Sequence, residues 1–254
     1  MVALAEQLTQ GLHAKRKIGV FLGAEQHNVK YDIEIRDDIW TWYGGRVKDY
    51  DATFSRVLSA LHLGSFREVL AARANAGLPT NVLDLMGGDA SFLRDLKLPA
   101  NRQNPSPLNA GLCVTLVDGR RESWRALDLK LNIEVLCGDL TSKNTWKLID
   151  ERQREMSIDA FDLIACRGGD GVLETMVPKA LYPFLFGKIW DRLTSKEGLF
   201  ITQLPETVRP RELLKQLRLI PGTRLSFQPA TKKEAELYPS LGIVKTPTAP
   251  KSLI

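Results

Sequence analysis

Five short polar or glycine-bearing segments could carry chemistry, because each directly follows an apolar run predicted to be a strand. They are residues 84–90, 118–120, 138–140, 167–171 and 203–206. In the first, the pair Gly87-Gly88 would let the main chain approach a ligand closely, since no Cβ atom intervenes. The same pair could also be nothing more than a tight turn between a strand and a helix.

Aspartates in two of these segments could recognise a nucleoside. Asp118 could accept two hydrogen bonds from vicinal ribose hydroxyls, and Asp139 could accept one from an exocyclic amine such as that of adenine. Together with the glycine pair, they predict a nucleoside-containing ligand across the first three strand ends. The simpler alternative is that each aspartate caps the helix that follows it.

The elements that must position these residues alternate between strand and helix. Strands rich in Val, Leu and Ile are typical of a parallel sheet buried on both faces, and the alternation predicts an open α/β sheet with right-handed crossovers. Ligands of such sheets bind beyond the carboxyl ends of the strands. We expect strands at 81–85, 112–117, 133–136, 161–165 and 198–204, and helices at 91–98, 121–130, 142–155 and 182–193.

Both ends of the chain break this alternation. Strands at 224–228 and 241–245 have no crossover helix between them, so we expect an antiparallel pair at an edge of the sheet. Residues 51–70 have helical apolar spacing, as one bent helix or two shorter ones, with Asp51 or Thr53 as the cap. We therefore predict a mostly parallel Rossmann-like domain over residues 55–254 and an N-terminal extension or lid over residues 1–54.

The extension contains an aromatic cluster followed by two glycines. Trp42 and Tyr43 lie in this cluster. Large aromatic residues most often pack in a core. The functional alternative is a lid that folds over the ligand, with Gly44-Gly45 as its hinge.

Composition excludes several classes of protein. Hydrophobic residues at 44% and charged residues at 26% are typical of a globular chain and argue against disorder. No apolar run approaches the ~18 residues of a membrane span, and the first residues lack a secretory-signal pattern. Three widely spaced cysteines and three early histidines offer neither a disulfide scaffold nor a metal motif. We expect a cytoplasmic protein without a metal.

The net charge of +5 is confined to one region. Basic and acidic residues balance over residues 1–200, whereas residues 201–254 carry nine basic and four acidic residues. Arg211, Lys215 and Arg218 fall on one face of a helix predicted at 210–219. That face is either solvated or a surface for an anionic partner. Charge alone does not indicate a nucleic-acid substrate.

The order of these segments resembles the class I S-adenosylmethionine-dependent methyltransferases over about residues 55–246. The likeness is carried by Val-Leu-Asp-Leu-Met-Gly-Gly-Asp-Ala at 82–90, Val-Asp at 117–118, Cys-Gly-Asp-Leu at 137–140 and Phe-Asp-Leu-Ile-Ala at 161–165. The family's loop usually reads D/E-x-G-x-G-x-G. Here Met86, Gly88 and Ala90 occupy the three glycine positions, and Gly87 falls between two of them.

The resemblance implies S-adenosylmethionine as the cofactor. The residues that would bind it are Asp84, Met86, Gly87, Gly88, Asp118, Gly119, Arg120, Asp139, Leu140 and Arg167, with Trp42 and Tyr43 toward the substrate. Asp170, Glu174 and Glu206 are the candidates for a general base, should the acceptor have to lose a proton. The acceptor is unidentified, with a small molecule preferred over a protein or an RNA.

Two other functions stay open. The altered glycine loop could belong to a non-catalytic, methyltransferase-like binding or assembly module. A nicotinamide-dependent oxidoreductase is the third hypothesis. The absence of a G-x-G-x-x-G motif after the first predicted strand argues against it.

Overall fold

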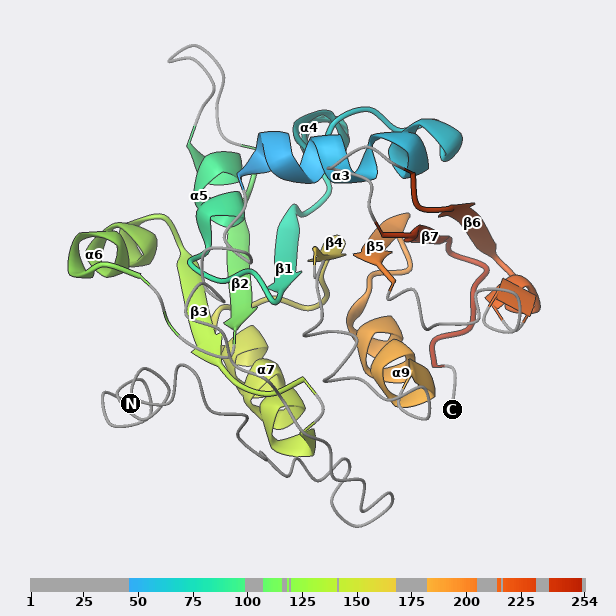
Figure 1. Ribbon diagram of the computed structural model, residues 1–254. Coiled ribbons are helices and arrows are strands. Elements are labelled where there is room, and N and C mark those ends of the chain that lie inside the picture. The colour runs from blue at the N-terminus through green and yellow to red at the C-terminus, as the bar shows by residue number, and fades with distance from the viewer. Residues whose placement is uncertain are drawn as a thin grey trace, which may run out of the picture.

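The computed structural model describes residues 46–98, 107–115, 118, 120–140, 142–167, 182–204, 214–215, 217–231 and 238–252. Within them, seven strands form one sheet in the order β3-β2-β1-β4-β5-β7-β6 (Figure 1). The strands are β1 Asn81–Leu85, β2 Ala110–Thr115, β3 Ile133–Cys137, β4 Leu163–Cys166, β5 Gly198–Gln203, β6 Thr223–Gln228 and β7 Ser240–Lys245. The helices are α3 Val47–Ala60, α4 Phe66–Asn75, α5 Ser91–Lys97, α6 Glu122–Lys130, α7 Lys143–Glu155 and α9 Tyr182–Arg192.

Strands β1 to β5 run parallel, and β7 runs antiparallel between β5 and β6. This confirms the predicted open, mostly parallel sheet and its antiparallel pair at the C-terminal edge. Strand order reverses at β1, because β2 and β3 extend to one side of it and β4 and β5 to the other. The carboxyl ends of β1 and β4 therefore form the switch point, where ligands of open α/β sheets bind.

Each face of the sheet is covered by its own hydrophobic cluster. Successive residues of a strand point to opposite faces. In β1, Val82 accordingly belongs to the cluster shared with α3, α4 and α5, while Leu83 belongs to the cluster shared with α7 and α9. The predicted buried strands are thus confirmed for the central part of the sheet.

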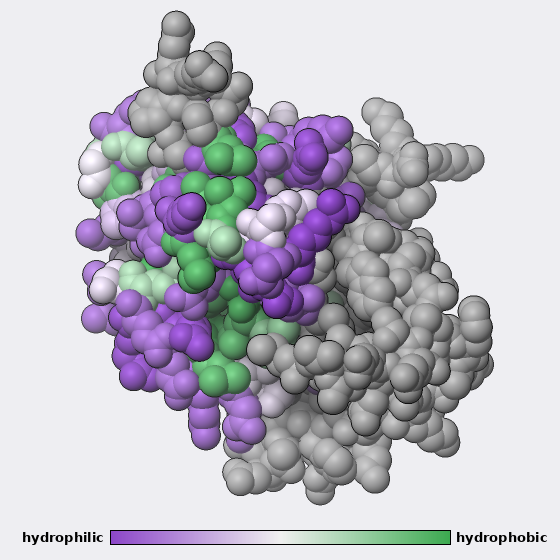
Figure 2. All heavy atoms as spheres, turned by 90° about the vertical axis from the view of Figure 1, so that its left-hand side faces the viewer, coloured by the Kyte–Doolittle hydropathy of each residue, from purple (hydrophilic) through white to green (hydrophobic). Residues whose placement is uncertain are grey.

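One side of the molecule is less well covered. Figure 2 looks onto the side where α6 and β3 lie, and a band of hydrophobic residues crosses its mainly hydrophilic surface. β3 is only partly buried, and Leu129 of α6 is 75% exposed. Apolar contacts therefore contribute little to holding α6 in place.

The predicted helix at 51–70 is two helices, and the predicted cap is wrong. α3 begins at Val47, where the Asp49 carboxylate accepts a hydrogen bond from the main-chain N–H of Arg46 at 2.8 Å. Asp51 lies inside α3, and its carboxylate instead accepts from the N–H of Phe66, the first residue of α4, at 2.9 Å. Residues 47–54 thus belong to a helix packed on the sheet, and residues 1–45, with Trp42 and Tyr43, lie outside the described residues.

In the part of the chain that the structure describes, no helix is both long and apolar enough to cross a membrane. The same residues contain no group of three or more side chains arranged to hold a metal ion.

Packing of α3 on β7 depends on the absence of a side chain at Gly242. A Cβ atom there would lie 2.4 Å from Cγ1 of Val57 and 2.9 Å from Cδ1 of Leu61. We expect Gly242→Ala to lower the free energy of unfolding by about 1–3 kcal/mol, the usual cost of overpacking a core. Val57→Ala in the same chain should recover part of this loss, measured by denaturant unfolding of both single variants and the double. Strictly additive losses would contradict this account of the contact.

Candidate functional site

The loop joining β1 to α5 keeps a left-handed backbone at every second residue. The φ angles of Met86, Gly88 and Ala90 are 63°, 61° and 60°. These are the three positions at which the resembled family carries glycine. Glycine adopts this conformation freely, whereas other residues pay about 1–2 kcal/mol. The loop therefore has a glycine-type conformation at three positions, of which only Gly88 is a glycine.

Gly87 is required by what lies beneath the loop. A Cβ atom at this position would come within 2.1 Å of Oδ2 of Asp84 and 2.8 Å of Sγ of Cys113. The Gly87 N–H also donates a hydrogen bond to the carbonyl of Val114 in β2, at 3.2 Å. The glycine pair predicted that the main chain comes close to a ligand. At Gly87, the group that the main chain approaches is instead the Asp84 carboxyl group.

Asp84 is fully buried, and it is paired on one oxygen only. Its Oδ1 accepts a hydrogen bond from the Tyr50 hydroxyl at 2.8 Å, while Oδ2 has no partner within the described residues. Burial raises the pKa of Asp84 to about 8; the Tyr50 hydrogen bond opposes this rise and the charge of Asp89 adds to it. At neutral pH the group is therefore mainly the uncharged acid.

Tyr50 belongs to this site, although the sequence did not predict it. Its ring stacks on Phe92 with centroids 3.9 Å apart, which fixes the hydroxyl against Asp84. The apolar spacing predicts a helix from residue 51 onward, which begins too late to include Tyr50. An earlier helix start would have placed Tyr50 on the buried face, one turn before Phe54.

At the end of β2, Asp118 is held by the guanidinium of Arg120. Nε and Nη2 of Arg120 donate to the two carboxylate oxygens at 2.9 and 3.0 Å, and the Arg120 N–H donates to Oδ1 at 3.0 Å. Burial alone would raise the pKa of Asp118, but the hydrogen bonds and charge of Arg120 outweigh it and lower the pKa overall. Asp118 is therefore an ionised, oriented acceptor.

The capping interpretations of both aspartates are wrong. Arg121 occupies the N-cap position of α6, without a side-chain cap. Ser142 caps α7, its Oγ accepting from the N–H of Asn144 at 3.2 Å. Neither Asp118 nor Asp139 is therefore the N-cap residue of the helix that follows it.

The end of β3 turns directly onto α7. A Cβ atom at Gly138 would meet the side chain of Thr145 at 2.6 Å, and the carbonyl of Leu140 accepts a hydrogen bond from Nε1 of Trp146 at 2.7 Å. Leu140 is buried and Asp139 is half-buried. This turn is consequently fixed to the helix rather than loose.

At the end of β4, α3 reaches over the strand ends. Nε of Arg167 donates to Oγ1 of Thr53 at 3.0 Å, and its guanidinium lies 5.7 Å from the centre of the Tyr50 ring. The structure thus brings Arg167 to the β1 side of the switch point, where its positive charge acts to lower the pKa of Asp84.

The remaining predicted residues divide into two groups. Gly119, Asp170, Glu174, Glu206 and Arg211 lie outside the described residues. Lys215 and Arg218 are exposed, while Leu214 and Leu217 beside them are buried, as the amphipathic pattern predicts.

Strand order, the antiparallel β7 and the loop after β1 together define the fold of the class I methyltransferases, as the sequence predicted. The sequence itself matches no protein-family model and no curated protein.

Several solved structures are similar to the chain. An rRNA methylase from Streptococcus thermophilus is 14% identical, with a TM-score of 0.39, over 66% of this chain and 87% of that one. A protein from Streptococcus mutans in complex with SAH is 11% identical, with a TM-score of 0.39, over 65% and 86% of the two chains. A release-factor-specific protein-(glutamine-N5) methyltransferase from Alicyclobacillus acidocaldarius is 13% identical, with a TM-score of 0.35, over 71% and 91%.

The left-handed position at residue 90 can be tested by a pair of glycine substitutions. Ala90→Gly should leave the free energy of unfolding unchanged or raise it by up to about 1 kcal/mol, because it relieves the left-handed strain at Ala90. Ala52→Gly, at an exposed position inside α3, should lower it by roughly 0.5–1 kcal/mol. Urea unfolding measures both. Equal losses at the two positions would contradict the strained conformation.

The buried Asp84 carboxyl predicts a dependence of stability on pH. Its pKa rises on folding, so between about pH 4 and pH 8 the folded state binds more protons than the unfolded state. Stability should therefore fall with rising pH in this window, by up to about 1.4 kcal/mol per pH unit from this group. Asp84→Asn should remove that slope and become more stable than the unaltered protein at pH 8.

Tyr50→Phe is the companion variant for this measurement. It removes the hydrogen bond that lowers the pKa of Asp84, so the fall in stability should extend to higher pH. Denaturant unfolding from pH 5 to pH 9 measures all three proteins. An unchanged slope in Asp84→Asn would show that this carboxyl group is not the one that titrates.

Proposed function

We propose that this protein binds S-adenosylmethionine and transfers its methyl group to an acceptor. The observation that carries the proposal is the left-handed backbone at Met86, Gly88 and Ala90, retained at the switch point of the sheet. Two of these residues adopt the conformation at an energetic cost. A strained backbone that surrounding packing maintains is typical of functional sites, and here it supports a ligand-binding loop.

The residues at hand fit such a cofactor. The main chain of the loop can approach it closely at Gly88, which carries no Cβ atom, and the ionised Asp118 can accept hydrogen bonds from its ribose hydroxyls. Asp139 and Leu140 would flank the adenine, and Arg167 the opposite end of the site. The bound cofactor supplies a methyl group that its sulfonium already makes electrophilic.

The contribution of the protein would then be mainly positional. Fixing two reactants in line and excluding water can supply on the order of 7–11 kcal/mol of the barrier. Asp84 is unsuited to act as the general base, because it lies beneath the loop and is uncharged at neutral pH. Asp170, Glu174 and Glu206 remain our candidates for an acceptor that must lose a proton.

We propose no class of acceptor. Of the similar proteins reported above, one is named for methylation of ribosomal RNA and another for methylation of a protein glutamine. The preference for a small molecule that the sequence suggested therefore finds no support. A non-catalytic module and a nicotinamide enzyme are the two alternatives that the binding experiment must separate.

Calorimetric titration with S-adenosylmethionine, S-adenosylhomocysteine and NAD tests the proposal. We expect both sulfur ligands to bind, and Asp118→Asn to weaken them by about tenfold or more, because each good hydrogen bond to a charged group is worth roughly 1.5–3 kcal/mol. The matched control is Glu122→Gln, which removes the same charge from a nearby side chain that is 90% exposed.

The outcomes separate the three functions. NAD binding without sulfur-ligand binding would overturn the proposal in favour of an oxidoreductase. Cofactor binding without methyl transfer to any acceptor from cell extracts would favour the non-catalytic module. Equal losses in Asp118→Asn and Glu122→Gln would remove the ribose assignment.

A further inference from the structure

Helix α6 presents a carboxylate to the interior where an apolar side chain would be expected. Of its nine residues, all of them described, Asp128 alone is buried, and its side chain is completely inaccessible. A buried carboxylate is costly unless it is paired and hydrogen-bonded. The partners of Asp128 therefore reveal what α6 is docked against.

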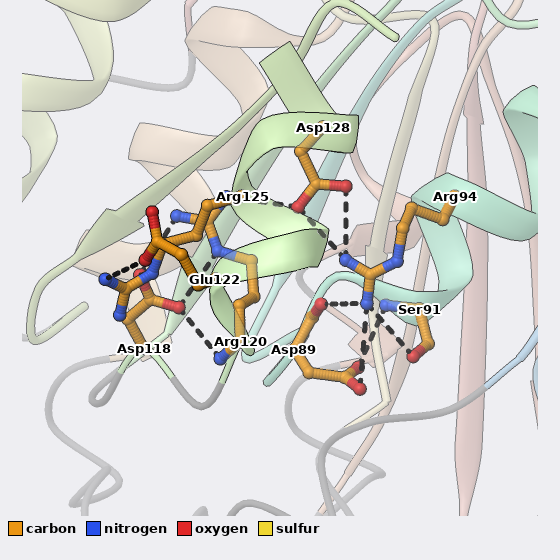
Figure 3. A network of polar contacts seen from close by, with 8 residues as sticks. All are labelled: Asp89, Ser91, Arg94, Asp118, Arg120, Glu122, Arg125 and Asp128. Carbon is orange, nitrogen blue, oxygen red and sulfur yellow. Dashed lines mark hydrogen bonds and ion pairs between the residues drawn. The ribbon is translucent and has the colours of Figure 1, made fainter. Parts of the chain in front are cut away.

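Two guanidinium groups converge on Asp128 from different elements (Figure 3). Nη1 of Arg94 donates to both carboxylate oxygens, at 3.1 and 3.0 Å, and Nη1 of Arg120 donates to Oδ2 at 3.1 Å. Both arginines are largely buried. One buried anion thus joins α5, which bears Arg94, to the segment after β2, which bears Arg120.

Arg94 continues the network to the glycine loop. Its Nη2 donates to the main-chain carbonyl of Asp89 and to Oγ of Ser91, and it lies 3.7 Å from the Asp89 carboxylate. The guanidinium also covers the ring of Trp124 in α6, 4.5 Å from its centre. Arg94 is therefore fixed from the loop, from α5 and from α6 at once.

Arg120 continues the network in the other direction. The same guanidinium that donates to Asp128 through Nη1 donates to Asp118 through Nε and Nη2. Because a guanidinium is planar and its donors are rigidly spaced, fixing one edge on Asp128 fixes the direction of the edge that faces Asp118. The position of Asp128 thereby sets the orientation of the Asp118 carboxylate.

We propose that Asp128 is a positioning residue for nucleoside binding, which holds Asp118 and the glycine loop in fixed relation across the site. This inference rests on the proposed function, because it takes Asp118 as the acceptor for ribose hydroxyls. Asp128 acts entirely through Arg120 and Arg94, and it is buried within the protein. The two groups that it aligns are the Asp118 carboxylate and the glycine loop. The role extends the site to a residue outside all five strand-end segments.

The test is a double-mutant cycle on binding of S-adenosylhomocysteine by calorimetry. Asp128→Asn keeps the shape of the side chain but removes the charge that orients Arg120. We expect it to weaken binding by about tenfold. Because Asp128 acts in part through Asp118, the double variant with Asp118→Asn should lose less affinity than the sum of the two single losses, since coupled residues do not add.

A second measurement distinguishes positioning from general stability. Adenosine should compete with the bound ligand better than 2′,3′-dideoxyadenosine in the unaltered protein, and Asp128→Asn should reduce this preference to near equality. The matched control is Asp162→Asn, a buried aspartate paired with Arg73 at the opposite ends of the strands. It should lower stability without changing the preference for adenosine.

Each outcome has one meaning. If the unaltered protein binds neither S-adenosylhomocysteine nor adenosine, the proposed function fails and this inference fails with it. If the unaltered protein binds and the two losses simply add, or the preference for adenosine survives in Asp128→Asn, the inference alone is overturned. Non-additive losses with a vanished preference support it.

Discussion

The contact between the Asp84 carboxyl group and the underside of Gly87 is the constraint on which the site depends. It leaves no space for a side chain at Gly87, and it requires a carboxyl group to remain in a fully buried position. Burial of a charge there would be costly, so the group is held mainly as the uncharged acid and anchored by the Tyr50 hydroxyl. The loop is thus supported from below by a polar group at Gly87, beside the apolar packing of Met86 and Ala90.

The same principle operates on the far side of the loop. None of the apolar side chains of α6 is buried, and its attachment depends on the pairing of Asp128 with Arg94 and Arg120. Such a buried network contributes less to net stability than apolar packing would, because each charge must lose its water. The buried network does, however, restrict its partners to few arrangements. A binding site requires this fixed geometry more than it requires additional stability.

Much of the fold could be predicted from the sequence, for identifiable reasons. The β1 strand was predicted at its observed bounds, since a run that is apolar except for Asp84 leads to a glycine pair, and the antiparallel edge pair followed from the missing crossover helix. The start of α3 could not be predicted as readily, because Asp51 and Thr53 are good caps by type, and the actual start uses Asp49 and the N–H of Arg46. Local propensity does not reveal which of several acceptable caps the tertiary packing selects.

The site was predictable only in part. The strand-end rule identified Asp118 and the glycine loop from position alone. The partners of Asp118 could not be found in this way, because Asp128 belongs to a helix whose sequence offers no sign that a carboxylate faces inward. Nor does the sequence reveal that Met86 and Ala90 adopt a left-handed backbone, since both are unusual residues for it.

The position of β7 has a consequence for how the molecule is made. β7 follows β6 in the chain but lies between β5 and β6, and β6 pairs with it alone among the described strands. During synthesis, β6 therefore leaves the ribosome with no strand to pair with, and β5 presents an open edge, until residues 240–245 have emerged. The parallel part of the sheet and its strand-end site can assemble first, and the edge of the sheet is sealed by a single later event that inserts β7.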